Sequence, residues 1–265
     1  MWPEHDPVEE LLRDALAAVD GMAGSDLLEI SDKGGDPRHA ADLVTEADLR
    51  VDEIISEGLH ALYGGVDVVS EERPETRPEE RGECFVLDPI DGTHNFVAGV
   101  PLWGISLARV VGARVEEAWF LEGDRRRLYS AKRGRGAFCG ARKLRVTPRG
   151  PELTLLSVAL SKEILPLLME AHRFSGVRVL GSHATALALA ASGELGVHVG
   201  RGHPWDVAAG YLLLEEAGGK VAGLRGEERP LWRTQNAVAG APKIVDMVLE
   251  ILNSGRLGPV EGITL

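Results

Sequence analysis

Residues 84–96 read CFVLDPIDGTHNF. The apolar residues at the start are typical of a short buried strand, and the proline and glycine that follow predict a tight turn at its end. Such a turn lets the carboxylates of Asp88 and Asp91 and the main-chain carbonyl of Ile90 point the same way, as oxygen ligands for Mg²⁺. If Thr93 begins a helical turn, the free N–H groups at Gly92 and Thr93 face the same space and can bind a phosphate oxygen. The segment therefore predicts a cation site beside an anion site.

Upstream of this segment, the sequence predicts two helices, a strand and a loop. Apolar residues recur at helical spacing between Val8 and Met22, so an amphipathic helix with its apolar side in the core is expected. Thr45 followed by Asp48 resembles a capping pair, which predicts a second helix with Asp48 in its first turn. Residues 66–69 are expected to form a short strand that stops at Ser70, and the charged residues 71–82, with two prolines, an exposed loop.

Downstream, the pattern divides into two kinds of structure. Residues 103–146 alternate β-rich segments with glycine-containing turns, which indicates an antiparallel meander. From about Thr154 strands alternate with helices, an α/β pattern. Strands are expected at 155–160, 177–180 and 196–199, and helices between 160 and 177, at 184–191 and at 207–217. We therefore expect an N-terminal α+β half, residues 1–150, with the antiparallel sheet and most metal motifs. An α/β half, residues 151–265, is expected to complete the site.

Composition narrows the class of protein. The 265 residues include 41 acidic and 29 basic side chains, a formal charge of -12, which argues against nucleic acid or an anionic membrane as the main partner. The first ten residues are acidic, unlike a signal peptide, and no apolar run is long enough to cross a bilayer, so a cytoplasmic location is expected. Cys84 and Cys139 are too few and too far apart in the sequence for a thiolate metal site and are expected to be buried thiols.

A cation site lined by carboxylates, next to an anion site, suits chemistry at phosphorus. Hydrolysis of phosphate monoesters needs up to ~10²¹-fold acceleration, which is on the order of 25 to 30 kcal/mol of barrier. Neutral hydrogen bonds at about 1 kcal/mol each cannot supply this. Two hard cations about 4 Å apart can supply this reduction of the barrier, because they polarise the phosphoryl oxygens and stabilise the leaving alkoxide.

Four segments in order carry a resemblance to a known family. They read DLVTEAD at 42–48, SEE at 70–72, DPIDGTHNF at 88–96 and WDVAAG at 205–210, and EAGG at 216–219 also matches. Together they resemble the inositol monophosphatase family of Mg²⁺-dependent, lithium-sensitive phosphatases. The resemblance implies the layered αβαβα sandwich of the sugar-phosphatase type, with α+β and α/β character, and a homodimer. It also implies a phosphoric monoester hydrolase that acts on small phosphorylated polyols or sugars.

The resemblance also assigns roles to single residues. It implies two or three Mg²⁺ ions: Glu71, Asp88 and the Ile90 carbonyl would bind one, and Asp88, Asp91 and Asp206 a second. Glu72, beside Glu71, would lie near a third, weaker position. Asp48 would hydrogen-bond Thr93, whose hydroxyl would orient the attacking water, so Asp48, Thr93 and Glu71 are the expected catalytic residues.

On the substrate side, the resemblance is less complete. Asp91, Gly92, Thr93 and Asp206 would meet the phosphate end, while Gly181, Ser182 and the segment around Arg201 would flank the alcohol portion. The glutamate that many inositol-specific members carry before the Trp-Asp pair is missing from residues 197–203. Arg201 instead suits a second anionic group. Inositol 1-phosphate is therefore the first expected substrate, and the alternative is a fructose-1,6-bisphosphatase or dual-specificity sugar phosphatase, as in archaeal members. Of these activities, that of a 3′-phosphonucleotide phosphatase is the least expected.

Each motif residue also has a simpler explanation. Asp88 and Asp91 can cap a turn, Asp206 can be a helix N-cap, Asp48 can do no more than cap, and Glu71 can be a loop charge. His94, His183 and His203 lack the spacing of a zinc site, so positions at the surface or the pocket edge are expected, and oxygen-rich ligation disfavours a zinc hydrolase. An inactive metal-binding scaffold would be expected to have lost a ligand, and none is missing.

Overall fold

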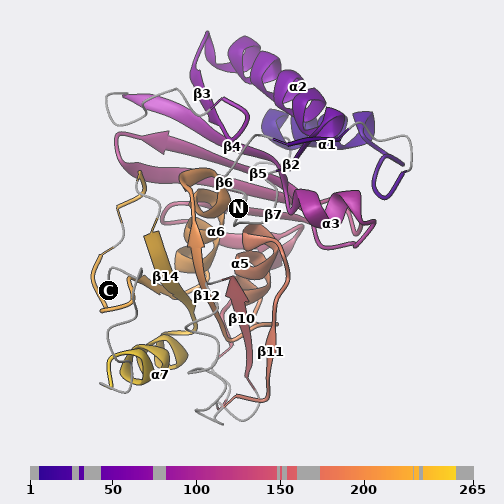
Figure 1. Ribbon diagram of the computed structural model, residues 1–265. Helices are drawn as coiled ribbons and strands as arrows, with labels where there is room; N and C mark the ends of the chain where they lie inside the picture. The colour runs from indigo at the N-terminus through magenta and orange to yellow at the C-terminus, as the bar shows by residue number, and fades with distance from the viewer. Residues whose placement is uncertain are drawn as a thin grey trace.

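The computed structural model describes residues 6–25, 30–32, 43–73, 82–147, 150, 154–159, 174–228, 230–232 and 235–254. Two sheets and three groups of helices alternate in five layers (Figure 1). Helices α1 and α2 cover one face of a seven-stranded sheet, α5 and α6 lie between that sheet and a five-stranded sheet, and α7 covers the outer face of the second sheet. This is the αβαβα order that the resemblance implied.

The first layer is built from two amphipathic helices. Helix α1 (Pro7–Ala18) begins where the Asp6 carboxylate accepts a hydrogen bond from the Val8 N–H. It buries Val8, Leu12, Ala15 and Leu16, as the helical spacing predicted, although it ends before Met22. Helix α2 (Glu46–Tyr63) starts with a capping box between Thr45 and Asp48, so Asp48 lies in the first turn, as predicted. The short strands β1 (Ile30–Asp32) and β2 (Leu43–Thr45) pair with each other.

The seven-stranded sheet has the order β3-β4-β5-β6-β7-β8-β9. Its strands are β3 (Asp67–Ser70), β4 (Glu83–Asp91), β5 (Gly104–Val111), β6 (Arg114–Glu122), β7 (Leu128–Lys132), β8 (Gly136–Cys139) and β9 (Arg142–Lys143). Strands β4 to β9 form an antiparallel meander, which confirms that prediction, whereas β3 runs parallel to β4. Because β3 and β4 run the same way, their carboxyl ends meet at one edge.

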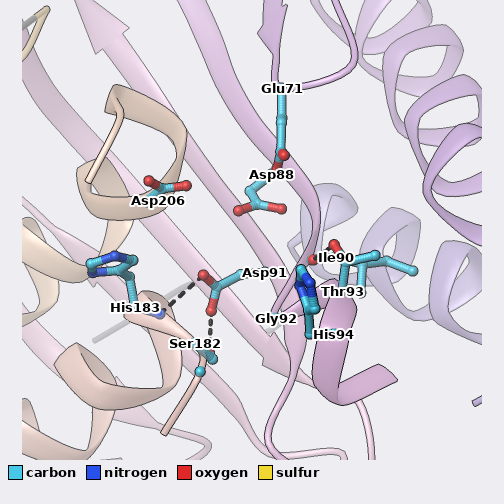
Figure 2. Close-up of a pocket in the computed structure, with 11 residues that line it drawn as sticks. Glu71, Asp88, Ile90, Asp91, Gly92, Thr93, His94, Ser182, His183 and Asp206 are labelled. Carbon is cyan, nitrogen blue, oxygen red and sulfur yellow. Dashed lines mark hydrogen bonds between the residues drawn. The ribbon is translucent and has the colours of Figure 1, made fainter. Parts of the chain in front are cut away.

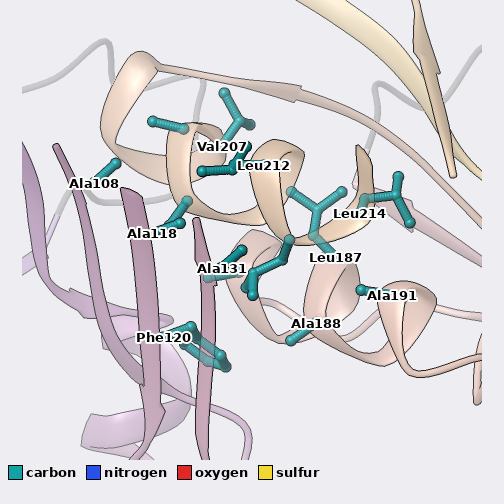
Figure 3. Close-up of a cluster of buried hydrophobic side chains, with 14 of the residues drawn as sticks. Ala108, Ala118, Phe120, Ala131, Leu187, Ala188, Ala191, Val207, Leu212 and Leu214 are labelled. Carbon is teal, nitrogen blue, oxygen red and sulfur yellow. The ribbon is translucent and has the colours of Figure 1, made fainter. Parts of the chain in front are cut away.

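Helices α5 (His183–Ala191) and α6 (Pro204–Glu216) form the middle layer. Both are apolar on nearly all sides, as expected for helices enclosed between two sheets. Alanine and leucine side chains of α5 and α6 pack against Ala108, Ala118, Phe120 and Ala131 of the first sheet (Figure 3). The second half thus shares a core with the first, and a boundary at residue 150 stays a prediction.

The five-stranded sheet has the order β11-β10-β12-β14-β13. Its strands are β10 (Leu155–Ala159), β11 (Gly176–Arg178), β12 (Val197–Gly202), β13 (Lys220–Ala222) and β14 (Gln235–Gly240), followed by helix α7 (Pro242–Leu252). Strands β10, β11 and β12 are parallel, while β14 is antiparallel to β12 and β13. No element was predicted after residue 217, and the structure adds β13, β14 and α7. The helix expected between 160 and 177 lies outside the described residues.

Several local predictions can be compared directly. Helix α6 begins at Pro204, before the predicted Val207, because proline at the first helical position has a suitable φ and no N–H to satisfy. The arginine run at 125–127 forms the β6–β7 turn, where Arg126 pairs with Asp20 at 2.6 Å and Arg127 with Glu122 at 2.6 Å. Both cysteines are free thiols; Cys84 is buried, as expected, whereas Cys139 is only half-buried. Among the helices that the structure describes, none is both long and apolar enough to cross a membrane.

Candidate active site

The end of strand β4 places two aspartates beside each other. Asp88 pairs with Ser106 of β5 and Asp91 with Gly104, so the register shifts between them and β4 bulges. Both side chains are almost fully buried, at 2% and 4% exposed. The turn at Pro89 that the sequence predicted is therefore an irregularity within a strand, and the strand ends only after Asp91.

Two further carboxylates reach Asp88 from other elements. Glu71 follows strand β3, and its main-chain N–H donates to the Leu87 carbonyl at 3.1 Å, which holds it next to β4. Asp206 comes from the first turn of α6, on the opposite side (Figure 2). One carboxylate oxygen from each of Glu71, Asp88 and Asp206 lies within 4.8 Å of the other two. The structure thus brings together three of the predicted metal ligands.

The surroundings of Asp88 fit a cation. Its Oδ1 is buried and has no hydrogen-bond partner among the described residues. Burial first, and then the charges of Glu71, Asp91 and Asp206, raise the pKa of Asp88 well above its usual value. A buried, unpaired carboxylate with anionic neighbours is costly unless a positive charge accompanies it. Three carboxylates without nitrogen or sulfur donors match the oxygen ligands that Mg²⁺ and Ca²⁺ prefer.

Asp91 has different partners. Its Oδ1 accepts a hydrogen bond from the His183 N–H at 3.1 Å, and its Oδ2 accepts from the Ala184 N–H at 3.0 Å and from the Ser182 hydroxyl. Burial outweighs these stabilising hydrogen bonds and raises the pKa of Asp91 to about 6. Asp91 lies outside the group of three carboxylates within 4.8 Å, and its role at a second ion stays a prediction.

The anion side of the site lies just after Asp91. Gly92 has φ 95°, and a Cβ there would come within 2.9 Å of the Leu102 carbonyl, so the position needs glycine. Helix α3 (Thr93–Val97) begins at the next residue, which confirms the predicted helical turn. The Thr93 hydroxyl lies 3.1 Å from the Ile90 carbonyl and 3.5 Å from Asp48 Oδ1. The expected contact between Asp48 and Thr93 is present.

Asn95, for which the sequence predicted no role, holds two loops together. Its Nδ2 donates to the Leu102 carbonyl at 2.6 Å and to the Leu180 carbonyl at 2.8 Å. A Cβ on Gly181, which has φ 70°, would come within 3.0 Å of this amide. Asn95 therefore ties α3 to the segment that precedes α5.

The pocket between these elements has a volume of about 180 Å³. Its walls are Glu71, Asp88, Ile90, Asp91, Gly92, Thr93, His94, Gly181, Ser182, His183 and Asp206. Asp48 lies behind Thr93, and the predicted substrate residue Arg201 is exposed on β12 and does not line the pocket. His94 and His183 are at the pocket, and His203 is exposed and stacks on Trp205 at 4.9 Å between centroids. The histidines thus lie where the sequence placed them.

Simpler roles explain only part of this arrangement. Asp48 does cap α2, yet it also reaches Thr93. Asp206 is the third residue of α6 and not its N-cap, and its Oδ2 accepts from the His203 N–H at 2.6 Å. The contact with the His203 N–H therefore engages Asp206 Oδ2, yet the same carboxylate also lies in the group that it forms with Glu71 and Asp88.

Comparison with known proteins gives consistent matches over most of the chain. A family model described as the inositol monophosphatase family matches residues 6–255. Inositol monophosphatase 2 of Rattus norvegicus is 33% identical over 238 residues, covering 82% of this chain and 81% of the relative. Nus factor SuhB of Escherichia coli strain K12 is 31% identical, covering 84% and 85%. The structure of a Thermotoga maritima IMPase is similar with a TM-score of 0.81 at 28% identity, covering 93% of this chain and 95% of that one.

Proposed function

The chain belongs to the inositol monophosphatase family of phosphoric monoester hydrolases, and we propose that it hydrolyses small phosphate monoesters with Mg²⁺ as the cofactor. The observation that carries this proposal is the group formed by buried Asp88 with half-buried Glu71 and Asp206, with one oxygen of Asp88 unpartnered among the described residues. Family membership supports the reaction, and the ligand chemistry supports the metal.

Five residues of the chain would hold the metal. The oxygens of Glu71, Asp88 and the Ile90 main chain lie on the β3–β4 side of the pocket, and Asp206 faces them from α6. Asp91 would join through lone pairs that its hydrogen bonds to α5 leave free, since a carboxylate has about four acceptor positions. Bound Mg²⁺ would supply positive charge that polarises the phosphoryl oxygens and lowers the pKa of water. Two or three ions per site are proposed from the family resemblance.

Thr93 and Asp48 would position the nucleophile. When the Thr93 hydroxyl donates to Asp48 Oδ1, 3.5 Å away, its lone pairs are free to accept a hydrogen bond from water. The water is then held with one lone pair directed at phosphorus, in line with the leaving oxygen. Glu71, at the same wall of the pocket, is the third proposed catalytic residue. No side chain attacks phosphorus in this scheme, so no phosphoenzyme forms.

The phosphate itself would lie over Gly92 and Thr93. The main-chain N–H groups at the start of α3 have no earlier helical turn to donate to, and they can donate to a phosphate oxygen. Because a Cβ on Gly92 would clash with neighbouring main chain, the glycine also keeps this backbone in place. Gly181 and Ser182 form the adjoining wall, where the alcohol portion of the substrate is expected.

Inositol 1-phosphate is the substrate that we propose first. The relatives include inositol monophosphatase 2, and a pocket of about 180 Å³ suits a small monoester. A sugar bisphosphate such as fructose 1,6-bisphosphate is the second candidate. Arg201 is exposed beyond the pocket wall, so a second phosphate that extends out of the pocket would be the group to reach it. A cytoplasmic homodimer remains a prediction from composition and resemblance.

Phosphate release from a panel of monoesters tests the proposal. The panel holds inositol 1-phosphate, fructose 1,6-bisphosphate and a 3′-phosphonucleotide, each with Mg²⁺ or with a chelator. We expect release that needs Mg²⁺ and disappears in Asp88→Asn. A purified, folded chain that binds Mg²⁺ but releases phosphate from none of these compounds would instead favour an inactive metal-binding scaffold.

A further inference from the structure

A buried chain of three polar side chains lies behind the pocket, and the proposed mechanism makes no use of it. Ser157 Oγ is 3.2 Å from His198 Nδ1, and His198 Nε2 is 3.1 Å from His183 Nδ1. The two rings meet edge to face at 82°, with centroids 5.2 Å apart. His198 and Ser157 are 3% and 1% exposed, whereas His183 lines the pocket.

The pattern of strand β12 makes room for this pair. Residues two apart in a strand share a face, so His198, Gly200 and Gly202 point the same way. A Cβ on Gly200 would come within 2.7 Å of His198 Nε2 and 2.8 Å of His183 Cε1. A Cβ on Gly202 would come within 3.1 Å of the Asp206 Cβ. Neither glycine has a positive φ, so both are needed for space and not for backbone conformation.

His183 connects this pair to one acidic residue of the site. Its main-chain N–H donates to Asp91 Oδ1 at 3.1 Å (Figure 2). Its ring contacts His198 on β12. The same strand leads into α6, where the His203 N–H donates to Asp206 Oδ2 at 2.6 Å. The two histidines therefore link the helix end that holds Asp91 to the strand end that holds Asp206.

The two hydrogen bonds of His198 have opposite directions. Both ring nitrogens of His198 have a polar partner, Ser157 Oγ at Nδ1 and His183 Nδ1 at Nε2. Burial lowers the pKa of His198 and so favours its neutral form, in which one ring nitrogen donates and the other accepts. His198 therefore donates one of these two hydrogen bonds and accepts the other, which makes the link between α5 and β12 specific in length and direction.

We propose that the His183–His198 pair, seated on Gly200, is a positioning device that fixes the distance between Asp91 and Asp206 and thereby sets the Mg²⁺ affinity of the site. The inference rests on the proposed function, because it concerns the ions that those carboxylates would hold. His183 and His198 are positioning residues, and neither is given a role in proton transfer. Hydrogen bonds behind metal ligands commonly tune metal affinity in this way.

Four variants test the proposal. His198→Leu removes the hydrogen bonds, Gly200→Ala pushes the rings apart without changing a polar group, and His198→Gln restores a donor near the position of Nε2. Gly82→Ala is the matched control, because a Cβ at Gly82 meets nothing within 4 Å. The measurements are Mg²⁺ titration calorimetry, imidazole ¹⁵N spectra of the metal-free protein, and kcat and KM for inositol 1-phosphate at saturating Mg²⁺.

We expect His198→Leu and Gly200→Ala to weaken Mg²⁺ binding roughly 10- to 100-fold, as for other partners of metal ligands. The ¹⁵N spectrum should lose the single His183 tautomer in both, and kcat at saturating Mg²⁺ should fall by a smaller factor than the Mg²⁺ affinity does. His198→Gln should recover part of the affinity, and Gly82→Ala should match the wild type. Far-UV circular dichroism identifies any variant that fails to fold, and Gly200→Ala and His198→Gln then carry the test.

Two results would overturn the inference. One is folded His198→Leu and Gly200→Ala proteins that bind Mg²⁺ as tightly as the wild type. The other is a His198→Gln protein that is no better than His198→Leu, since packing and not hydrogen bonding would then explain the loss. A wild-type protein that neither binds Mg²⁺ nor releases phosphate would refute the proposed function instead, and the two failures are therefore distinguishable.

Discussion

The hydroxyl of Thr93 and the carboxylate of Asp48 lie 3.5 Å apart, although 45 residues separate them in the chain. The other oxygen of Asp48 accepts from the Thr45 N–H at 2.8 Å, so the start of α2 fixes the orientation of the carboxylate. A helix cap and a proposed catalytic contact thus share one side chain.

We first predict the effect of removing the Thr93 hydroxyl. Thr93→Val keeps the β-branched shape but cannot hold water, and kcat should fall ~10²- to 10⁴-fold, the usual range for a lost general acid–base contact. Mg²⁺ affinity from calorimetry should stay unchanged, because Thr93 is not a proposed ligand. Thr93→Ser, which keeps the hydroxyl, should retain most of the activity. Equal losses in the two variants would show that the methyl group and not the hydroxyl matters.

A second prediction concerns Asp88→Asn. Phosphate release should be abolished, because Asp88 is a proposed metal ligand in the group that it forms with Glu71 and Asp206. The metal-free protein should be at least as stable as the wild type, because the change removes one buried negative charge from a group of like charges. Thermal unfolding in chelator measures this. If the variant is unfolded at room temperature, Asp88 has a structural role that the acidic group does not explain.

The pH dependence of stability provides a third prediction. The pKa of Asp91 is raised to about 6, so its protonated form favours the folded state. That contribution is complete below pH ~4, the unfolded value, and is lost as pH rises through about 6. The free energy of unfolding of the metal-free protein should therefore decrease over this range, and Asp91→Asn should make the decrease smaller. A steeper decrease in Asp91→Asn, measured by urea unfolding, would contradict the assigned shift.

Mg²⁺ should reverse this trend. The ion binds ionised carboxylates, so its stabilising effect should increase with pH over the same interval. The difference in Tm with and without Mg²⁺ should be small near pH 4 and large at pH 7. A difference that does not depend on pH would place the ion away from Asp88 and Asp91.

The fourth prediction separates two classes of substrate. Arg201→Ala should raise KM for fructose 1,6-bisphosphate and leave KM for inositol 1-phosphate nearly unchanged, because only the bisphosphate has a group that extends to β12. Arg178→Ala, which removes another exposed arginine of the same sheet, is the control. Equal effects of Arg201→Ala on both substrates would remove Arg201 from the substrate site.

Much of the candidate site could be predicted because its residues lie in short segments with strong local signals. The turn residues around Asp88 and Asp91 and the capping pair Thr45–Asp48 have their structural cause within a few residues. The partners of Asp91 could not be predicted, since Ser182 and Ala184 lie more than 90 residues away and meet it only when α5 packs on the first sheet.

The histidine pair was missed for a related reason. A single His198 in an apolar strand gives no periodic signal, and its partner lies in a different element. The alternation of His198, Gly200 and Gly202 was the available clue, because two glycines on one face of a strand indicate a close approach by something else. Strand β14 and helix α7 could have been found from the apolar spacing of residues 235–252.

Helices α5 and α6 lie between the two sheets and supply both the partners of Asp91 and the carboxylate of Asp206. The ion site is therefore divided between parts of the chain that are synthesised early and late. A nascent chain can form the whole meander and its covering helices and still lack the last ligand. Tight Mg²⁺ binding would then indicate that the middle layer has docked on the first sheet, and only chains that reach this stage would gain stability from the ion.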